Sequence, residues 1–144
     1  RHQSINENSI ILENFYKREN IKFELFKFDN NIINSLRDTD LCITRSGAST
    51  LSELVFLNIP FITIPLPGAK DEHQFHNAKF FEEKGFCWVY EQNIKNDNLV
   101  RLLQKILSDD KEYFEKKNNM REFCYNSSWN DINQKILSVI NYGN

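Results

Sequence analysis

A turn of small and hydroxylated residues, RSGAST at positions 45–50, stands between an apolar run and the start of a helical pattern. Where a strand leads into a helix, unpaired backbone N–H groups and the positive end of the helix dipole favour an anion. Gly47 and Ala48 are small enough to let a phosphate approach the backbone, and the hydroxyls of Ser49 and Thr50 can donate hydrogen bonds. On local sequence alone, an ordinary capped turn is as good an interpretation as an anion site.

Two charged residues flank this turn, and each has two interpretations. Thr50 and Glu53 have the spacing of a capping box, which places Glu53 in the first turn of a predicted helix over 50–57. A carboxylate there either caps the helix or accepts two hydrogen bonds from neighbouring ligand hydroxyls. Arg45 either neutralises a phosphate or pairs with a surface acid, which is the commoner use of an exposed arginine.

The richest polar cluster, DEHQFHNA at positions 71–78, opens another predicted helix after a loop with Pro and Gly. His73 and Asn77 are four residues apart and therefore share a helical face. Polar side chains where a strand ends commonly hydrogen-bond a hydroxylated ligand. His73 and His76 have a spacing that permits a metal, but no third ligand is well placed, and we predict no metal site.

The cysteines do not indicate catalysis, disulfides or zinc. Cys42, Cys87 and Cys124 are widely spaced and form no CxxC pair. Cys42 lies inside a predicted strand, and no serine lies in a nucleophile elbow. We therefore expect three core thiols in a reducing compartment.

The elements that must position these residues alternate between strands and helices. The hydrophobic periodicity predicts strands over 22–28, 40–44, 61–64 and 86–90 and helices over 6–20, 30–37, 50–57 and 72–84. Gly85 stands where a glycine ends a helix. Such alternation is typical of an α/β fold with a doubly wound parallel sheet.

The C-terminal third is predicted to be helical throughout. Apolar residues recur there at helical spacing, first at Leu99, Leu102, Leu103, Ile106 and Leu107, then at Tyr113, Phe114 and Met120. Trp129, Ile132, Ile136 and Ile140 predict a terminal amphipathic helix.

Composition limits the partners. The 144 residues fit a single domain, and 40% hydrophobic residues supply a core. A net charge of −2 without a basic patch does not favour nucleic acid. No apolar run approaches the roughly 20 residues of a membrane helix, and the N-terminus is not a signal peptide. Because the sequence begins at Arg1 without Met, we expect a fragment of a longer protein.

Three motifs, in order and spacing, resemble one family. RSGASTLSEL, the strand from Pro60 to IPLP, and DEHQFHNA are similar to the C-terminal, donor-binding domain of the MurG family, the peptidoglycan N-acetylglucosaminyltransferases of glycosyltransferase family 28. His2-Gln3, Phe28, Lys84-Gly85 and Glu91-Gln92 extend the resemblance over essentially the whole chain.

The resemblance implies a Rossmann-like half of a GT-B glycosyltransferase that binds UDP-N-acetylglucosamine. The segment 48–53 matches the diphosphate and ribose segment, with Glu53 taking the ribose hydroxyls. Gln74, helped by His73, matches the contact to the sugar hydroxyls. The predicted substrate-binding residues are Asp29, Arg45, Ser46, Gly47, Ala48, Ser49, Thr50, Leu51, Ser52, Glu53, His73, Gln74 and Asn77, and none is predicted to be catalytic.

The chain departs from the family pattern at three places. Asp29 occupies the position whose backbone reads the uracil, where the family is usually apolar. Ser4 or Ile5 stands where a glycine usually follows His-Gln, and the Gly-rich GGS loop would lie upstream of Arg1. We therefore expect residues 1–144 to form one nucleotide-sugar domain that lacks the acceptor domain, the first strand and the GGS loop.

The implied reaction is a single inverting displacement, without metal or cofactor. The 4-hydroxyl of undecaprenyl-pyrophosphoryl-MurNAc-pentapeptide (lipid I) attacks the anomeric carbon of the donor sugar, giving lipid II as UDP leaves, and the fixed N–H groups at the helix start meet the developing charge. The family acts peripherally on the cytoplasmic face of the bacterial inner membrane. The general base belongs to the N-terminal domain, so the isolated chain is expected to be inactive.

Two other functions stay open. One is the donor-binding chain of a two-subunit, lipid-linked N-acetylglucosamine transferase. The other is a nucleotide-binding module without catalysis, because fold alone does not establish function.

Overall fold

The computed structural model of the chain describes residues 7–26, 29, 31–69, 72–92 and 97–126. The chain divides into two compact units, Arg1–Leu36 and Arg37–Asn144. The predicted terminal helix over 129–140, together with His2, Gln3 and Phe28, lies outside the described residues.

The second unit is built on a three-stranded parallel sheet in the order β1-β2-β3. The strands are β1 (Cys42–Thr44), β2 (Phe61–Thr63) and β3 (Cys87–Val89). The helices are α3 (Ala48–Phe56), α4 (His73–Glu83), α5 (Asp97–Ser108) and α6 (Asp110–Asn126). The predicted strands over 40–44, 61–64 and 86–90 and the helices that follow the first two are thus confirmed.

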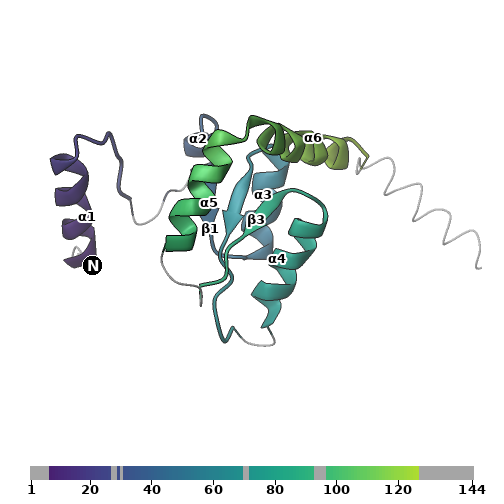
Figure 1. Cartoon of the computed structure of the whole chain (residues 1–144), viewed down its shortest axis with the longest axis horizontal. Helices are drawn as coiled ribbons and strands as arrows, with labels where there is room; N and C mark the ends of the chain where they lie inside the picture. Colours follow the sequence, from purple (N-terminus) through teal and green to yellow (C-terminus); the bar gives the residue numbers. More distant parts are fainter. Residues whose placement is uncertain (1–6, 27–28, 30, 70–71, 93–96, 127–144) are drawn as a thin grey trace, which may run out of the picture. The chain divides into compact units, whose positions relative to one another are not determined.

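Helices cover both faces of this sheet, as a doubly wound fold requires. Side chains alternate along β2, so Ile62 packs with Trp88 and Ile106 of α5 on one face. On the other face Phe61 stacks edge-on against Phe81 of α4, with ring centroids 6.1 Å apart. Figure 1 shows α5 in front of the sheet and α3 behind it. The predicted α/β class is confirmed.

Helices α3 and α4 end in the same way, with a residue in the left-handed conformation. Gly85 has φ +72° and follows α4, as predicted, while Asn58 has φ +58° and follows α3. The next residue donates its N–H back into the helix, from Phe86 to the Phe81 carbonyl at 3.1 Å and from Ile59 to the Leu54 carbonyl at 3.0 Å. Both helix ends therefore return the chain at once to a buried apolar residue that leads to the next strand.

The predicted capping box of Thr50 and Glu53 is wrong. Helix α3 begins at Ala48 with Gly47 as its N-cap, and no side chain caps it. Glu53 is consequently the sixth residue of the helix and lies in its second turn. The N-cap is therefore Gly47 and lies three residues before Thr50, the residue that the capping box would have made the N-cap.

The first unit contains α1 (Glu7–Arg18) and α2 (Ile32–Leu36), which lie within the predicted helices over 6–20 and 30–37. The predicted strand over 22–28 is wrong for its described part, 22–26, which has no strand conformation. Phe26 is 55% exposed there, and this unit has no described strand with which the segment can pair. A pattern of alternating aromatics does not form a strand without a partner backbone.

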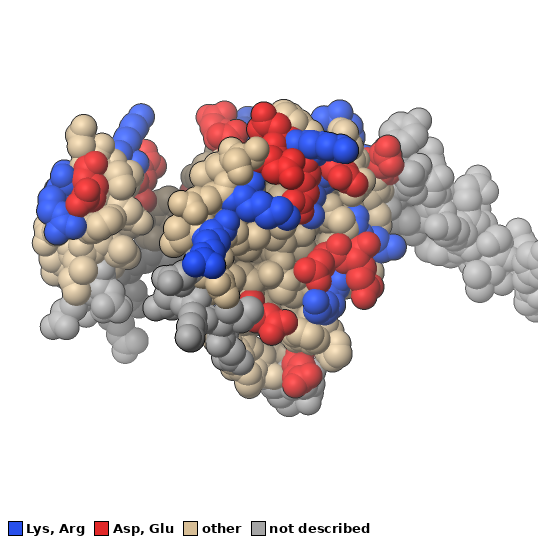
Figure 2. Space-filling model, viewed as in Figure 1, with Lys and Arg blue, Asp and Glu red and all other residues tan. Residues whose placement is uncertain are grey.

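A carboxylate ties α5, α6 and the sheet together. Glu112 of α6 accepts a hydrogen bond from the indole Nε1 of Trp88 at 2.7 Å and pairs with Lys105 of α5 at 2.8 Å. Lys116 lies over the Trp88 ring, 4.6 Å from its centroid. Basic and acidic side chains accordingly stand side by side over this region of the surface (Figure 2). The pKa of Glu112 is lowered mainly by the hydrogen bond that it accepts from Lys105, and also by the one that it accepts from Trp88.

Gly85→Ala is expected to destabilise the protein more than Gly68→Ala. Both glycines have positive φ, +72° and +71°, so alanine costs about 1–2 kcal/mol at either position. Only at Gly85 does the added Cβ come within 2.5 Å of the Asn119 side chain, which donates to the Gly85 carbonyl. Urea unfolding followed by circular dichroism measures the free energy of unfolding of both variants. Equal losses of that free energy would contradict the role of Asn119.

Glu112→Gln is expected to lower the free energy of unfolding at pH 7 by about 1 kcal/mol, because it removes a charge-assisted pair. The folded-state pKa of Glu112 lies below its ordinary 4.5, so the carboxylate stabilises the fold above that pH and the effect disappears as pH falls through the lowered pKa. Urea titrations from pH 7 down to acid conditions test this. A difference between the two proteins that persists in acid would contradict it.

Candidate nucleotide-sugar site

The carboxyl ends of the three strands form one edge of the sheet, because the strands are parallel and pair in register. Thr44 pairs with Thr63, and Thr63 pairs with Val89. The segment after β1 leads directly into α3, and the loop after β2 leads into α4. Ligands of open α/β sheets collect at such an edge.

The turn after β1 is held from two sides at Ser46. The Ser46 hydroxyl and the Thr63 hydroxyl lie 2.7 Å apart, and both residues are 0% exposed. The amide of Asn77, from α4, donates to the Ser46 carbonyl at 3.0 Å. The Ser46 side chain, predicted as a ligand contact, is therefore buried beneath the site, and Asn77 contacts the turn itself.

The first turn of α3 presents backbone N–H groups at this edge. Gly47 is an extended N-cap with φ −73° and ψ 126°, and the first intrahelical hydrogen bond runs from the Leu51 N–H to the Gly47 carbonyl at 3.0 Å. An α-helix leaves its preceding N–H groups, here those of Ala48, Ser49 and Thr50, without intrahelical acceptors. This arrangement can bind a diphosphate.

One face of α3 carries the remaining predicted residues. Ser49, Ser52 and Glu53 are exposed, whereas Leu51 is 0% exposed and belongs to the core. Ser49 and Glu53 are four residues apart, so they are neighbours on the helix surface. A ligand bound at the N-terminus of α3 thus has Glu53 one turn farther along the same face.

Arg45 bridges two strand ends. Its guanidinium Nη1 donates to Gln92 Oε1 at 2.8 Å and to the Ile64 carbonyl at 3.3 Å. Both acceptors are neutral, so neither hydrogen bond neutralises the charge of the arginine. Sequence reasoning missed Gln92 as part of this edge, although its place just beyond a predicted strand was an available signal.

Gln74 is oriented by the loop that precedes α4. Its Oε1 accepts a hydrogen bond from the Leu66 N–H at 3.0 Å, which orients the amide and leaves its NH₂ able to donate to a ligand. His73, the first residue of α4, is exposed. Among the described residues no group of three or more His, Cys, Asp and Glu is placed to hold a metal ion.

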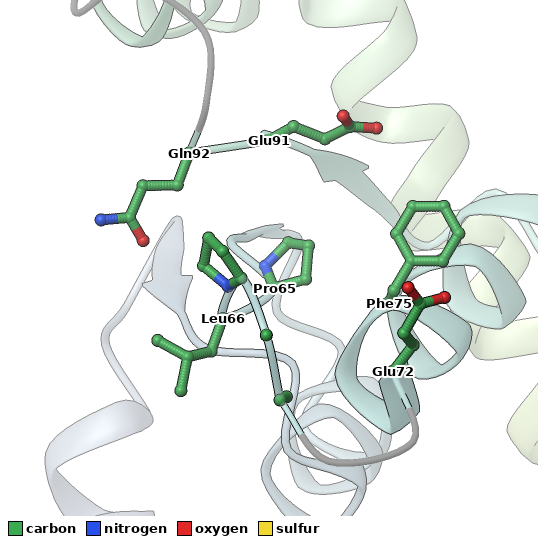
Figure 3. Close-up of a pocket in the computed structure, with 9 residues that line it drawn as sticks. Pro65, Leu66, Glu72, Phe75, Glu91 and Gln92 are labelled. Atoms are coloured by element: carbon green, nitrogen blue, oxygen red, sulfur yellow. The ribbon is translucent and has the colours of Figure 1, made fainter.

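Two cavities border this edge. One of about 270 Å³ is lined by Pro65, Leu66, Pro67, Gly68, Ala69, Glu72, Phe75, Glu91 and Gln92. Figure 3 shows Glu72 and Phe75 on one side of it and Gln92 on the other. The second, of about 400 Å³, is lined by Arg45, Ile64, Tyr90, Gln92, Leu99 and Val100. Of the residues predicted from the sequence, only Arg45 lines either cavity.

Asp29 belongs to the first unit and organises the start of α2. Its carboxylate accepts hydrogen bonds from the Asn31 N–H at 2.8 Å and the Ser35 hydroxyl at 2.6 Å. These bonds, that from Ser35 foremost, lower the pKa of Asp29. The Asp29 side chain thus contacts only neighbouring residues in the described structure, whereas the role predicted for this position is a contact of its backbone with uracil.

The comparison with protein families agrees with the motifs. Residues 1–135 match the family model described as "Glycosyltransferase family 28 C-terminal domain". The chain belongs to this family. The resemblance inferred from the three motifs is thereby confirmed.

Individual relatives of the family-28 chain carry one name. The chain is 49% identical over 138 residues to a UDP-N-acetylglucosamine--N-acetylmuramyl-(pentapeptide) pyrophosphoryl-undecaprenol N-acetylglucosamine transferase of Pelagibacter ubique. The match covers 93% of the chain and 39% of that relative. It is 38% identical over 110 residues to the protein of that name from Rickettsia bellii, covering 76% and 31%. The chain therefore spans well under half the length of these relatives.

A solved structure supports the family-28 fold. The crystal structure of Acinetobacter baumannii MurG matches with a TM-score of 0.68 and 24% identity, over 83% of this chain and 35% of that one. At this identity the likeness shows the fold alone. The roles of individual residues in this family-28 domain remain predictions.

The thiols of this domain are expected to react slowly in the folded protein. Burial raises the pKa of Cys42 and Cys124 and raises that of Cys87 to about 12, so little reactive thiolate forms near pH 8. Labelling with Ellman's reagent at pH 8 checks this, with urea-unfolded protein as the control in which all thiols react quickly. Rapid labelling of Cys87 in the native protein would contradict it.

Proposed function

We propose that this chain is the UDP-N-acetylglucosamine-binding part of an inverting N-acetylglucosaminyltransferase that converts lipid I to lipid II in peptidoglycan synthesis. The observation that carries the proposal is the N-terminus of α3, which opens at the carboxyl edge of a parallel sheet with a glycine N-cap and no side-chain cap. Helix dipole and backbone N–H groups there suit the diphosphate of a nucleotide sugar. Family membership and the name shared by the relatives agree with it.

In this proposal the donor lies along the exposed face of α3. The diphosphate meets the N–H groups of the first turn, with Arg45 supplying a compensating charge. Glu53, one turn along from Ser49, accepts hydrogen bonds from the ribose hydroxyls. The NH₂ of Gln74, with His73 beside it in the sequence, donates to the sugar hydroxyls.

The chemistry supplied by these residues is stabilisation of the leaving group. As the acceptor hydroxyl attacks the anomeric carbon, the bond to the β-phosphate breaks and negative charge accumulates on UDP. Fixed N–H dipoles at the α3 N-terminus favour that charge without reorganising. We assign the acceptor, its activating base and a peripheral position on the cytoplasmic membrane face to the full-length enzyme. Within the described residues, no helix is long and apolar enough to cross a bilayer.

Glu53→Ala is expected to weaken UDP binding by roughly tenfold, the effect of losing about 1.4 kcal/mol of hydrogen bonding to the ribose. Isothermal titration calorimetry of the 144-residue chain with UDP and with 2′,3′-dideoxy-UDP measures it. The variant and the original chain should bind the dideoxy nucleotide equally, because the hydroxyls are missing from the ligand.

Glu115→Ala is the matched control, since Glu115 is an exposed carboxylate of α6. It should bind UDP as the original chain does. Unchanged UDP binding by Glu53→Ala would remove Glu53 from the site, and absence of UDP binding by the original chain would contradict the proposed function.

A further inference from the structure

The buried hydroxyl pair of Ser46 and Thr63 connects the centre of the sheet to the proposed diphosphate site. Thr63 is the last residue of β2, the central strand, and its carbonyl accepts the Tyr90 N–H at 3.0 Å. On the other side the Ile64 N–H donates to the Thr44 carbonyl at 2.8 Å. Thr63 is therefore fixed by both neighbouring strands.

Ser46 connects Thr63 to the start of α3. It directly precedes Gly47, the N-cap, so its orientation sets where the first N–H groups of the helix point. The 2.7 Å hydrogen bond between the hydroxyls of Ser46 and Thr63 holds its side chain, and the Asn77 amide holds its carbonyl. Both hydroxyls are 0% exposed, so neither is available to a ligand.

We propose that Thr63 is a positioning residue for diphosphate binding, acting through Ser46 on the N-terminus of α3. The inference rests on the proposed function. A hydrogen bond that is buried at both ends fixes geometry strongly, because either hydroxyl left alone would be buried without a partner. Sub-ångström changes in the N–H groups weaken their hydrogen bonds to a fixed phosphate.

Thr63→Val is the direct test, since valine keeps the shape of threonine and removes the hydroxyl. Calorimetry of the full chain with UDP should show affinity roughly tenfold lower, and Thr63→Ser, which restores a hydroxyl, should recover it. Affinity unchanged in Thr63→Val, or unrecovered in Thr63→Ser, would overturn the proposal.

Ile106→Val separates positioning from a general loss of stability. Ile106 is a core residue of α5, 4% exposed, in the cluster with Ile62, Trp88 and Tyr90. Its truncation lowers the melting temperature without touching the Ser46 turn, and UDP affinity should stay at the original value. An equal loss of affinity in Ile106→Val and Thr63→Val would assign the effect to stability and overturn the proposal.

A double-variant cycle tests whether Thr63 acts through Ser46. Ser46→Ala and Thr63→Val each break the same hydrogen bond, so the double variant should lose no more UDP affinity than either single variant. Additive losses would contradict the pathway through Ser46. If the original chain itself fails to bind UDP, the proposed function fails. If it binds and Thr63→Val binds equally well, only the positioning role fails.

Discussion

The in-register parallel pairing of β1, β2 and β3 is the constraint on which the rest of this edge depends. Because the strands end at the same level, residues that follow them meet although they are far apart in the sequence. Arg45 reaches Gln92 across the end of β2, and Ser46 reaches Thr63. A slip of β2 by one residue would exchange the two faces of that strand and bring Ile62 or Ile64 where Thr63 now lies. An apolar side chain there would leave the buried Ser46 hydroxyl without a partner.

The helices are secured differently at their two ends. At the edge away from the candidate site, Asn58 and Gly85 close α3 and α4 with backbone hydrogen bonds and return the chain to buried Ile59 and Phe86. At the candidate site neither helix has a side-chain cap, and Glu72, which precedes α4, has φ +50°. The backbone hydrogen bonds that close α3 and α4 thus lie where no ligand is proposed, while the uncapped N-termini of both helices keep their N–H groups at the functional edge. Such a distribution exchanges some stability for binding capacity.

The local sequence pattern correctly predicted the elements with a strong hydrophobic periodicity. It was wrong about one strand, which would need a partner strand, and about the residue at which α3 begins. The three strands of the second unit and the end of α4 follow from apolar runs and from Gly85 alone. The segment 22–26 has an aromatic pattern but no described strand beside it in its unit. The capping box was wrong because a spacing of three residues does not reveal where a helix begins. Starting α3 at Ala48 moved Glu53 from the cap to the exposed second turn, which favours its use by a ligand.

The candidate site was predictable in its location and less so in the use of each polar side chain. Sequence reasoning counted Ser46, Asn77 and Gln74 alike as ligand contacts, because a polar residue at a strand end serves either a ligand or the fold. Their partners distinguish them: Ser46 is buried against Thr63, and Asn77 donates to Ser46. For Gln74 the partner indicates which end of the amide contacts the ligand. Its oxygen already accepts the Leu66 N–H, so its NH₂ is the group proposed to contact the ligand, and a sugar hydroxyl can accept that hydrogen bond.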